Sequence, residues 1–423
     1  PPQAMPAPLP AAPAAPPPRS TGVKPAVVFL LCTVLLDAMG IGSILPIMPD
    51  LIRNVQGGTL AQAALWGGVL STSFAVMQFL FGPVIGGLSD RFGRRPVLLL
   101  SLVVMCLDYM LMAVAGSIWL LLAGRIIGGV AASTQSTANA CMADLSAPED
   151  KSANFGLIGA AFGIGFVLGP LIGGLLAEYG TRAPFWAAAF LAGLNAIFGW
   201  FVLTETVTDR IRRAFSWRRA NPLGTLRALG KLPQIRRLLV VYFIYQFAFI
   251  VYPTIWAYFG HARFDWSPAL IGLSLGLFGV SMAVVQGGLI RIALRRFGES
   301  GTIVYGLLFS IVSYVAIALV TSGTVALILT PIAAFGGVIA PALQGIMSRA
   351  TGDDQQGELQ GAMVSVNALA MILSPLVMTS VFYSFTADNA PVYAPGAPFV
   401  LSAALTGLAL LIYLRPLRGA QIT

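Results

Sequence analysis

Long uncharged apolar stretches recur along almost the whole chain, and they constrain the fold more than any other feature. A helix that crosses a membrane needs about 20 mainly apolar residues. Because lipid cannot hydrogen-bond an exposed backbone, such stretches must be helical. The sequence therefore predicts an all-α polytopic membrane protein with twelve transmembrane helices, at about 25–47, 64–87, 97–115, 118–141, 154–177, 184–204, 238–260, 268–293, 301–321, 323–348, 357–384 and 397–415.

The composition agrees with a chain that is solvated by lipid. Charged residues make up 10% of it, whereas soluble domains contain about 25%. The net charge of +9 does not indicate nucleic-acid binding, because the basic residues lie in short connectors rather than on one face. No phosphate-binding loop, HExxH, paired CxxC or GxSxG pattern is present. We expect no enzyme activity, no catalytic residues, no metal and no cofactor other than a proton gradient.

One connector is much longer than the others and divides the predicted helices six and six. We expect four parts: a disordered Pro/Ala-rich tail at 1–22, a first six-helix half at 23–204, a basic central loop at 205–237 and a second six-helix half at 238–418. With the N-terminus inside, 21 of the 25 Lys and Arg lie on the inner side. The positive-inside rule then places both termini and the central loop in the cytoplasm. We expect the protein to lie in the cell's inner (plasma) membrane.

A charged, glycine-rich turn between the second and third predicted helices, residues 86–95, resembles the G-x-x-x-D-R-x-G-R-R signature of the major facilitator superfamily. The resemblance implies that Asp90 docks against the start of the eleventh helix and helps to hold the outward-facing state. It also implies that Asp90 is coupled to Arg94 and to Asp144. The alternative is a basic loop that only sets topology. The expected gate residues are Gly86, Asp90, Arg91, Gly93, Arg94, Arg95 and Asp144.

The fifth predicted helix is similar to the G-x-x-x-G-P-x-x-G-G motif of the drug-exporting antiporter branch of that superfamily. Gly-Pro interrupts the hydrogen bonding of a helix and kinks it, and small residues let two helices pack closely. The motif residues are Gly165, Gly169, Pro170, Gly173 and Gly174.

Several stretches narrow the resemblance to the tetracycline-resistance-like drug/proton antiporters. They lie at 35–42, 89–100, 107–109, 341–345 and 356–361. The chain departs from that group at Met282 and Ser310, where the group carries a His in the eighth helix and an Asp in the ninth. Gln286 is retained. The departure argues against tetracycline as the substrate and leaves proton coupling to the first half.

Three charged residues fall well inside predicted helices: Asp37, Asp108 and Arg125. Each costs about 2.5–3.5 kcal/mol at the centre of a membrane helix. A carboxylate there can take up a proton or pair with Arg125, and switching between those states is what proton coupling needs. A static Asp–Arg pair, or a carboxylate that only binds substrate, is the alternative. The single histidine, His261, is interpreted as a solvated residue of an outer loop.

Polar and flexible side chains elsewhere in the spans are candidates for a substrate cavity, with hydrogen bonding between helices as the alternative. We predict a monomeric, proton-coupled exporter of an amphipathic small molecule that works by alternating access. Uptake or facilitated diffusion of an organic solute is the first alternative, and a non-transporting scaffold or receptor is the second. The predicted cavity residues are Gln78, Asn139, Tyr245, Gln246, Met282, Gln286, Gln344 and Asn367.

Overall fold

The computed structural model describes residues 25–132, 134–147, 150–207, 235–352 and 355–415. Every regular element in these ranges is a helix. The predicted tail at 1–22 and most of the predicted central loop at 205–237 lie outside the described residues.

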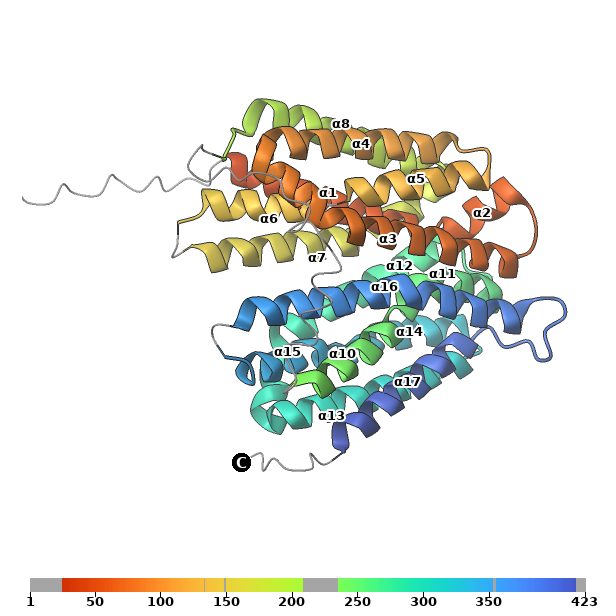
Figure 1. Ribbon diagram of the computed structural model, residues 1–423. Helices are drawn as coiled ribbons and strands as arrows, with labels where there is room; N and C mark the ends of the chain where they lie inside the picture. Colours follow the sequence, from red (N-terminus) through yellow and green to blue (C-terminus); the bar gives the residue numbers. More distant parts are fainter. Residues whose placement is uncertain (1–24, 133, 148–149, 208–234, 353–354, 416–423) are drawn as a thin grey trace, which may run out of the picture.

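The helices form two groups, which Figure 1 shows side by side. The first half consists of α1 (Pro25–Ile44), α2 (Met48–Gln56), α3 (Leu60–Phe92), α4 (Arg94–Val114), α5 (Ile118–Ala131), α6 (Thr134–Leu145), α7 (Lys151–Leu176), η1 (Ala177–Tyr179) and α8 (Ala183–Val202). The second half consists of α10 (Arg236–Phe249), α11 (Val251–Phe264), α12 (Pro268–Val284), η4 (Val285–Leu289), α13 (Ile290–Leu319), α14 (Gly323–Ala333), η5 (Ala334–Val338), α15 (Ile339–Arg349), α16 (Gln356–Thr386) and α17 (Ala397–Leu414).

These elements account for twelve membrane crossings, as predicted. Eleven helical stretches of the described chain are long and apolar enough to span a membrane. One of them, Pro268–Leu319, has 52 residues, whereas one crossing takes about 20. It is broken at Gly298, whose φ of 65° is not helical. This stretch therefore supplies two crossings, and the predicted tight turns near 116 and 322 separate the helices on either side of them.

Two features of the connection between the first and second crossings were not predicted. The short helix α2 follows α1 directly, with Pro49 in its first turn, where a missing amide hydrogen costs nothing. Helix α3 begins at Leu60 rather than near 64. Thr59 and Gln62 exchange side-chain and backbone hydrogen bonds at its start, and this capping box begins the helix early.

The two halves pack tightly at one end of the molecule, which we call the Asp50 end. Between α7 and α12, a Cβ added at Gly272 would strike the carbonyl of Pro170, and one at Gly174 would strike that of Pro268. Between α3 and α16, a Cβ at Gly68 would lie 3.1 Å from the Pro375 carbonyl. These glycines allow the helices of the two halves to approach closely.

The same helices part toward the opposite end, which we call the Arg94 end. A Cβ added at Gly86 of α3, Gly159 of α7 or Gly361 of α16 would meet no atom within 4 Å. The same holds for Gly288 of η4. The described structure is therefore closed at the Asp50 end and open at the Arg94 end.

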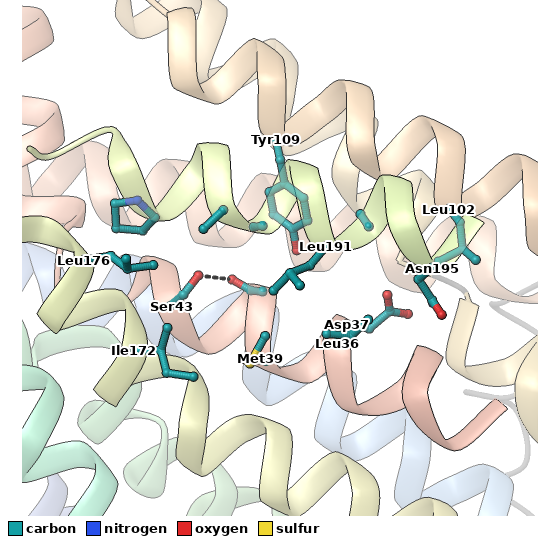
Figure 2. Close-up of a pocket in the computed structure, with 15 residues that line it drawn as sticks. Leu36, Asp37, Met39, Ser43, Leu102, Tyr109, Ile172, Leu176, Leu191 and Asn195 are labelled. Atoms are coloured by element: carbon teal, nitrogen blue, oxygen red, sulfur yellow. Dashed lines mark hydrogen bonds between the residues drawn. The ribbon is translucent and has the colours of Figure 1, made fainter. Parts of the chain in front are cut away.

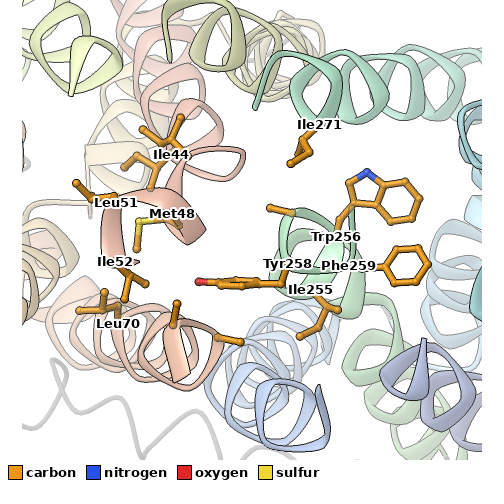
Figure 3. Packing of buried hydrophobic residues seen from close by; sticks show 14 of the residues in the cluster. Ile44, Met48, Leu51, Ile52, Leu70, Ile255, Trp256, Tyr258, Phe259 and Ile271 are labelled. Carbon is orange, nitrogen blue, oxygen red and sulfur yellow. The ribbon is translucent and has the colours of Figure 1, made fainter. Parts of the chain in front are cut away.

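A buried apolar cluster closes the Asp50 end, and Figure 3 shows its side chains from both halves facing one another. Tyr258 of α11 reaches across to Gly67 of α3. Beside the cluster, His261 Nε2 lies 3.5 Å from Asp50 Oδ2 of α2. The interpretation of His261 as a solvated loop residue is wrong: it lies in the last turn of α11, and its side chain is 12% exposed.

The Asp50–His261 contact predicts a measurable weakening of this seal in Asp50→Asn. The contact is an ion pair when the imidazole is protonated, and partly exposed pairs contribute at most about 1 kcal/mol. In a background without the three native cysteines, we expect Ile44→Cys, which is buried in the cluster, to react about two- to fivefold faster with a maleimide when Asp50→Asn is present. Val392→Cys, which is exposed, serves as the labelling reference. Unchanged reactivity of Ile44→Cys would show that the contact does not hold the seal.

Candidate functional site

Two of the three predicted intramembrane charges form a buried pair in the first half. Asp108 lies on α4 and Arg125 on α5, and Arg125 Nη2 is 3.5 Å from Asp108 Oδ2. The Arg125 guanidinium also lies 5.3 Å from the ring centre of Phe74 on α3. Both charged side chains are at most 10% exposed. Arg125 thus pairs with Asp108 rather than with Asp37.

Glycines of α5 make room for this carboxylate. A Cβ at Gly128 would strike Asp108 Oδ2, and one at Gly124 would lie 3.0 Å from Oδ1. Within the described part of the chain, Asp108 Oδ1 and Arg125 Nε have no hydrogen-bond partner. Buried polar atoms are nearly always satisfied, so this pair can accept a proton, a water or a substrate group.

Asp37 lines a separate small cavity of about 30 Å³ inside the first half, between α1, α4, α7 and α8. Figure 2 shows Asp37, Tyr109 and Asn195 around this cavity. The Asn195 amide donates to Thr33 at 2.9 Å. A site for one water needs about 10–15 Å³. The cavity can therefore hold about two waters next to Asp37.

Tyr109 connects the two acidic sites. It follows Asp108 in α4, and its hydroxyl packs against Gly40, one turn after Asp37 in α1. Asp108 faces α5, whereas Tyr109 faces α1 near Asp37. Two adjacent residues of α4 therefore lie on the Arg125 side and on the Asp37 side of that helix. The structure thus places all three predicted charges in one half and within one continuous set of helices.

A much larger cavity, of about 770 Å³, lies between the halves. It is lined by α7 and by Leu45, just after α1, from the first half and by residues at the α10–α11 break, α12 and η4 from the second. Met282 and Gln286, both predicted cavity residues, line it. Gln286 lies in η4, a π-helical turn. Such turns occur frequently at functional sites.

The α10–α11 break beside this cavity is stabilised by side chains from α16 and α17. Ser374 donates to the carbonyl of Phe247 at 2.7 Å, and Ser402 donates to that of Ala248 at 3.1 Å. Pro253 has no amide hydrogen, so the Phe249 carbonyl loses the donor it would have in a continuous helix. Two serines distant in the sequence therefore stabilise an irregular backbone at the cavity wall.

The other six predicted cavity residues do not line this cavity. Gln246 donates to Asn367 at 2.7 Å, which joins α10 to α16. Gln78 donates to the Ala132 carbonyl at 3.5 Å, and Tyr245 is buried in the core of the second half. Asn139 is half-buried on α6, and Gln344 is exposed on α15.

The two departures from the tetracycline-resistance pattern lie against neighbouring glycines of η5. The Met282 sulfur packs against Gly337, and the Ser310 hydroxyl packs against Gly336. A side chain on either glycine would overlap these atoms. In the described part of the second half, no Asp, Glu, Lys, Arg, His, Asn or Gln is buried, and the buried polar groups belong to Ser, Thr, Tyr and Trp.

The predicted gate residues form a network within the first half. Arg94 pairs with Asp90 and also with Asp144 of α6, at 3.3 Å. Glu205, which was not predicted, accepts hydrogen bonds from the backbone amides of Arg94 and Arg95 at the start of α4. A Cβ at Gly93, where φ is 110°, would strike this carboxylate. No local signal marks Glu205 as a helix cap, because it lies 111 residues away from its partner.

The remaining gate residues lie around this network. Arg95 donates to the Trp200 carbonyl at 2.8 Å and lies over the Trp200 ring, and Arg91 lies over Phe92. Gly86 is in open space. In the second half, Glu299 pairs with Arg349 at the end of α15. The turn after the second crossing thus carries the basic member of its ion pair, Arg94, whereas the turn after the eighth crossing carries the acidic member, Glu299.

The predicted antiporter motif packs α7 directly onto α1. A Cβ at Gly169 would lie 2.5 Å from the Met39 carbonyl oxygen and 2.9 Å from Gly42 Cα. Gly165 and Gly173 face the carbonyls of Leu35 and Ser43 in the same way. Gly174 meets the second half at α12, and Pro170 contacts both Gly42 of α1 and Gly272 of α12. One helix therefore contacts both the Asp37 side of α1 and the opposite half.

Comparison with known proteins agrees with this architecture. Residues 30–375 match the family described as Major Facilitator Superfamily. The chain belongs to the major facilitator superfamily. Tetracycline resistance protein, class C, from Escherichia coli is 41% identical over 357 residues, which cover 84% of this chain and 89% of that protein. As a member of this superfamily, the chain is a multi-pass membrane transporter for small molecules and not an enzyme.

Solved structures of the superfamily have the same fold. The human organic anion transporter MFSD10 (TETRAN) is 28% identical with a TM-score of 0.67, and the match covers 92% of this chain and 99% of that one. The nucleoside transporter NupG has a TM-score of 0.75 at 13% identity, with 92% and 98% of the two chains covered. At that identity, the second likeness concerns the fold alone.

Proposed function

We propose that this superfamily member is a proton-coupled exporter of an amphipathic small molecule. The observation that carries the proposal is the cluster of Asp37, Asp108 and Arg125 inside the first half, next to an antiporter motif that packs α7 onto α1. A buried carboxylate can either carry a proton or pair with an arginine, and these two states differ in charge. The similarity to tetracycline resistance proteins supports export.

Alternating access supplies the mechanism. The halves are closed at the Asp50 end and form a cavity between them. The predicted topology places the Arg94 end in the cytoplasm of a cell whose inner membrane holds the protein, so the described state faces inward. Docking of Asp90 on the start of α16 would then belong to the opposite, outward-facing state. One chain contains both halves, and we propose that it works as a monomer.

Uptake or facilitated diffusion of an organic solute is a second candidate. It is favoured by the neutral Met282 and Ser310, which leave the described part of the second half without a buried Asp, Glu, Lys, Arg or His. The likeness to a human organic anion transporter is compatible with it.

Transport in liposomes under an imposed pH gradient distinguishes these candidates. With purified protein and a compound panel that includes tetracycline, we expect at least one compound to move against its gradient while protons move the other way. Asp37→Asn and Asp108→Asn should each reduce the effect of the gradient by about fivefold or more, the usual range of a lost coupling free energy. Asp388→Asn, in an exposed loop, is the matched control. Transport that ignores the gradient would favour facilitated diffusion.

A further inference from the structure

Aromatic rings from both halves face the large cavity. On the first-half wall, Phe162 and Phe166 of α7 lie with ring centres 6.2 Å apart and planes 15° apart. On the second-half wall, Phe249, Tyr252 and Phe278 form a cluster with ring centres 4.9–6.2 Å apart. Aromatic pairs in such arrangements gain about 0.5–1.5 kcal/mol beyond burial alone. A ring-bearing ligand can therefore contact both halves at once.

No charge faces this ligand space among the described residues that line it. They include no Asp, Glu, Lys, Arg or His, and the Gln286 amide is the polar group at its η4 end. Burying an ion without a partner is very costly, whereas one amide can satisfy one hydrogen-bonding group. The lining therefore disfavours anions, cations and metal chelates.

The acidic residues of the first half do not supply a charge to the large cavity. Asp37 lines the separate small cavity together with Ile172 and Leu176 of α7, whereas Phe162 through Pro170 of that helix line the large one. Asp108 is paired with Arg125. Helix α7, which is in backbone contact with α1 at Gly165, Gly169 and Gly173, contributes different stretches to the two cavities.

We propose that the large cavity binds an uncharged, drug-sized molecule with an aromatic ring and one group that hydrogen-bonds to Gln286. The volume of about 770 Å³ lies within the usual range for small-molecule sites, about 300–1,000 Å³. The inference rests on the proposed transport function, for which this molecule is the substrate. It also means that substrate and proton occupy separate sites, so that any coupling between them passes through the α1–α7 contact.

A charge-matched probe series tests this inference. 9-Anthracenecarboxamide, 9-anthracenecarboxylate and 9-(aminomethyl)anthracene share one ring system and carry charges of about 0, −1 and +1 at pH 7. Binding to protein in lipid nanodiscs is measured by equilibrium dialysis without a pH gradient, and empty nanodiscs correct for partition into lipid. We expect the carboxamide to bind with a Kd at least about tenfold lower than either charged analogue.

Three variants make the result specific to the cavity. Val280→Trp fills space in the wall of the cavity and should abolish carboxamide binding, while Val312→Trp, on an exposed face of α13, should leave it unchanged. Gln286→Glu keeps the shape but adds a charge, and should move the preference toward the ammonium probe. Tighter binding of a charged probe to the unmodified protein, no saturable binding of the carboxamide, or full binding to Val280→Trp would overturn the proposal.

The result is independent of proton coupling, because no gradient is applied. Carboxamide binding without gradient-driven transport would overturn the exporter function and leave the cavity inference standing. Gradient-driven transport of a charged compound, together with tighter binding of a charged probe, would support the exporter function and overturn the cavity inference.

Discussion

Gly169→Ala is expected to destabilise the protein by about 1–3 kcal/mol, the usual cost of overpacking. The new Cβ would lie 2.5 Å from the Met39 carbonyl oxygen and 2.9 Å from Gly42 Cα. Both are backbone atoms, so α1 and α7 must separate to admit it. Separation would also disturb the Asp37 cavity, which both helices line. Thermal unfolding of the purified protein in detergent measures the effect.

The matched control is Gly159→Ala in the same helix. A Cβ there meets no atom within 4 Å, and alanine favours a helix over glycine by about 1 kcal/mol. The same substitution should therefore leave stability unchanged or slightly increase it at 159, while lowering it at 169. Equal stability of the two variants would contradict the close packing of α7 on α1.

Arg125→Gln is expected to cost about 3–5 kcal/mol, because it leaves the Asp108 carboxylate buried without its partner. The substitution also removes the contact with Phe74. Adding Asp108→Asn removes the unpaired charge. The double variant should therefore lose less stability than the two single variants together, by about 0.5–3 kcal/mol.

A double-mutant cycle of unfolding free energies measures this coupling. Asp108→Asn combined with Arg349→Gln, an exposed residue of the second half, is the control and should be additive within about 0.5 kcal/mol. Additive losses at 108 and 125 would mean that the 3.5 Å contact contributes no interaction energy. The pair would then be a poor candidate for a charge-switching element.

Much of the architecture follows from local sequence signals. The run at 97–115 becomes α4, and the turns near 116 and 322 separate helices as expected. Helix α2 was missed because nine residues with two charges do not resemble a span. The stretch Pro268–Leu319 is helical almost throughout, yet the sequence predicts two crossings there. The non-helical backbone at Gly298 marks the boundary between them.

The candidate site was predictable in part. The intramembrane charges were identified because a charge in an apolar run is costly, and the structure brings Arg125 to Asp108. It could not be known in advance that Glu205 caps α4 or that Gln246 bonds Asn367 across helices. Such contacts join positions more than 100 residues apart, and no local pattern encodes them.

The sequence by itself determined the class of protein, the crossings, the superfamily and the residues that carry charge into the membrane. Hydropathy and short motifs are local properties, and a window of about 20 residues contains them fully. Only the tertiary structure decided which carboxylate pairs with Arg125, which end of the bundle is closed, and that Asp37 and the large cavity are separate. These features depend on which faces of distant helices meet, and backbone contacts at glycines such as Gly169 set that arrangement.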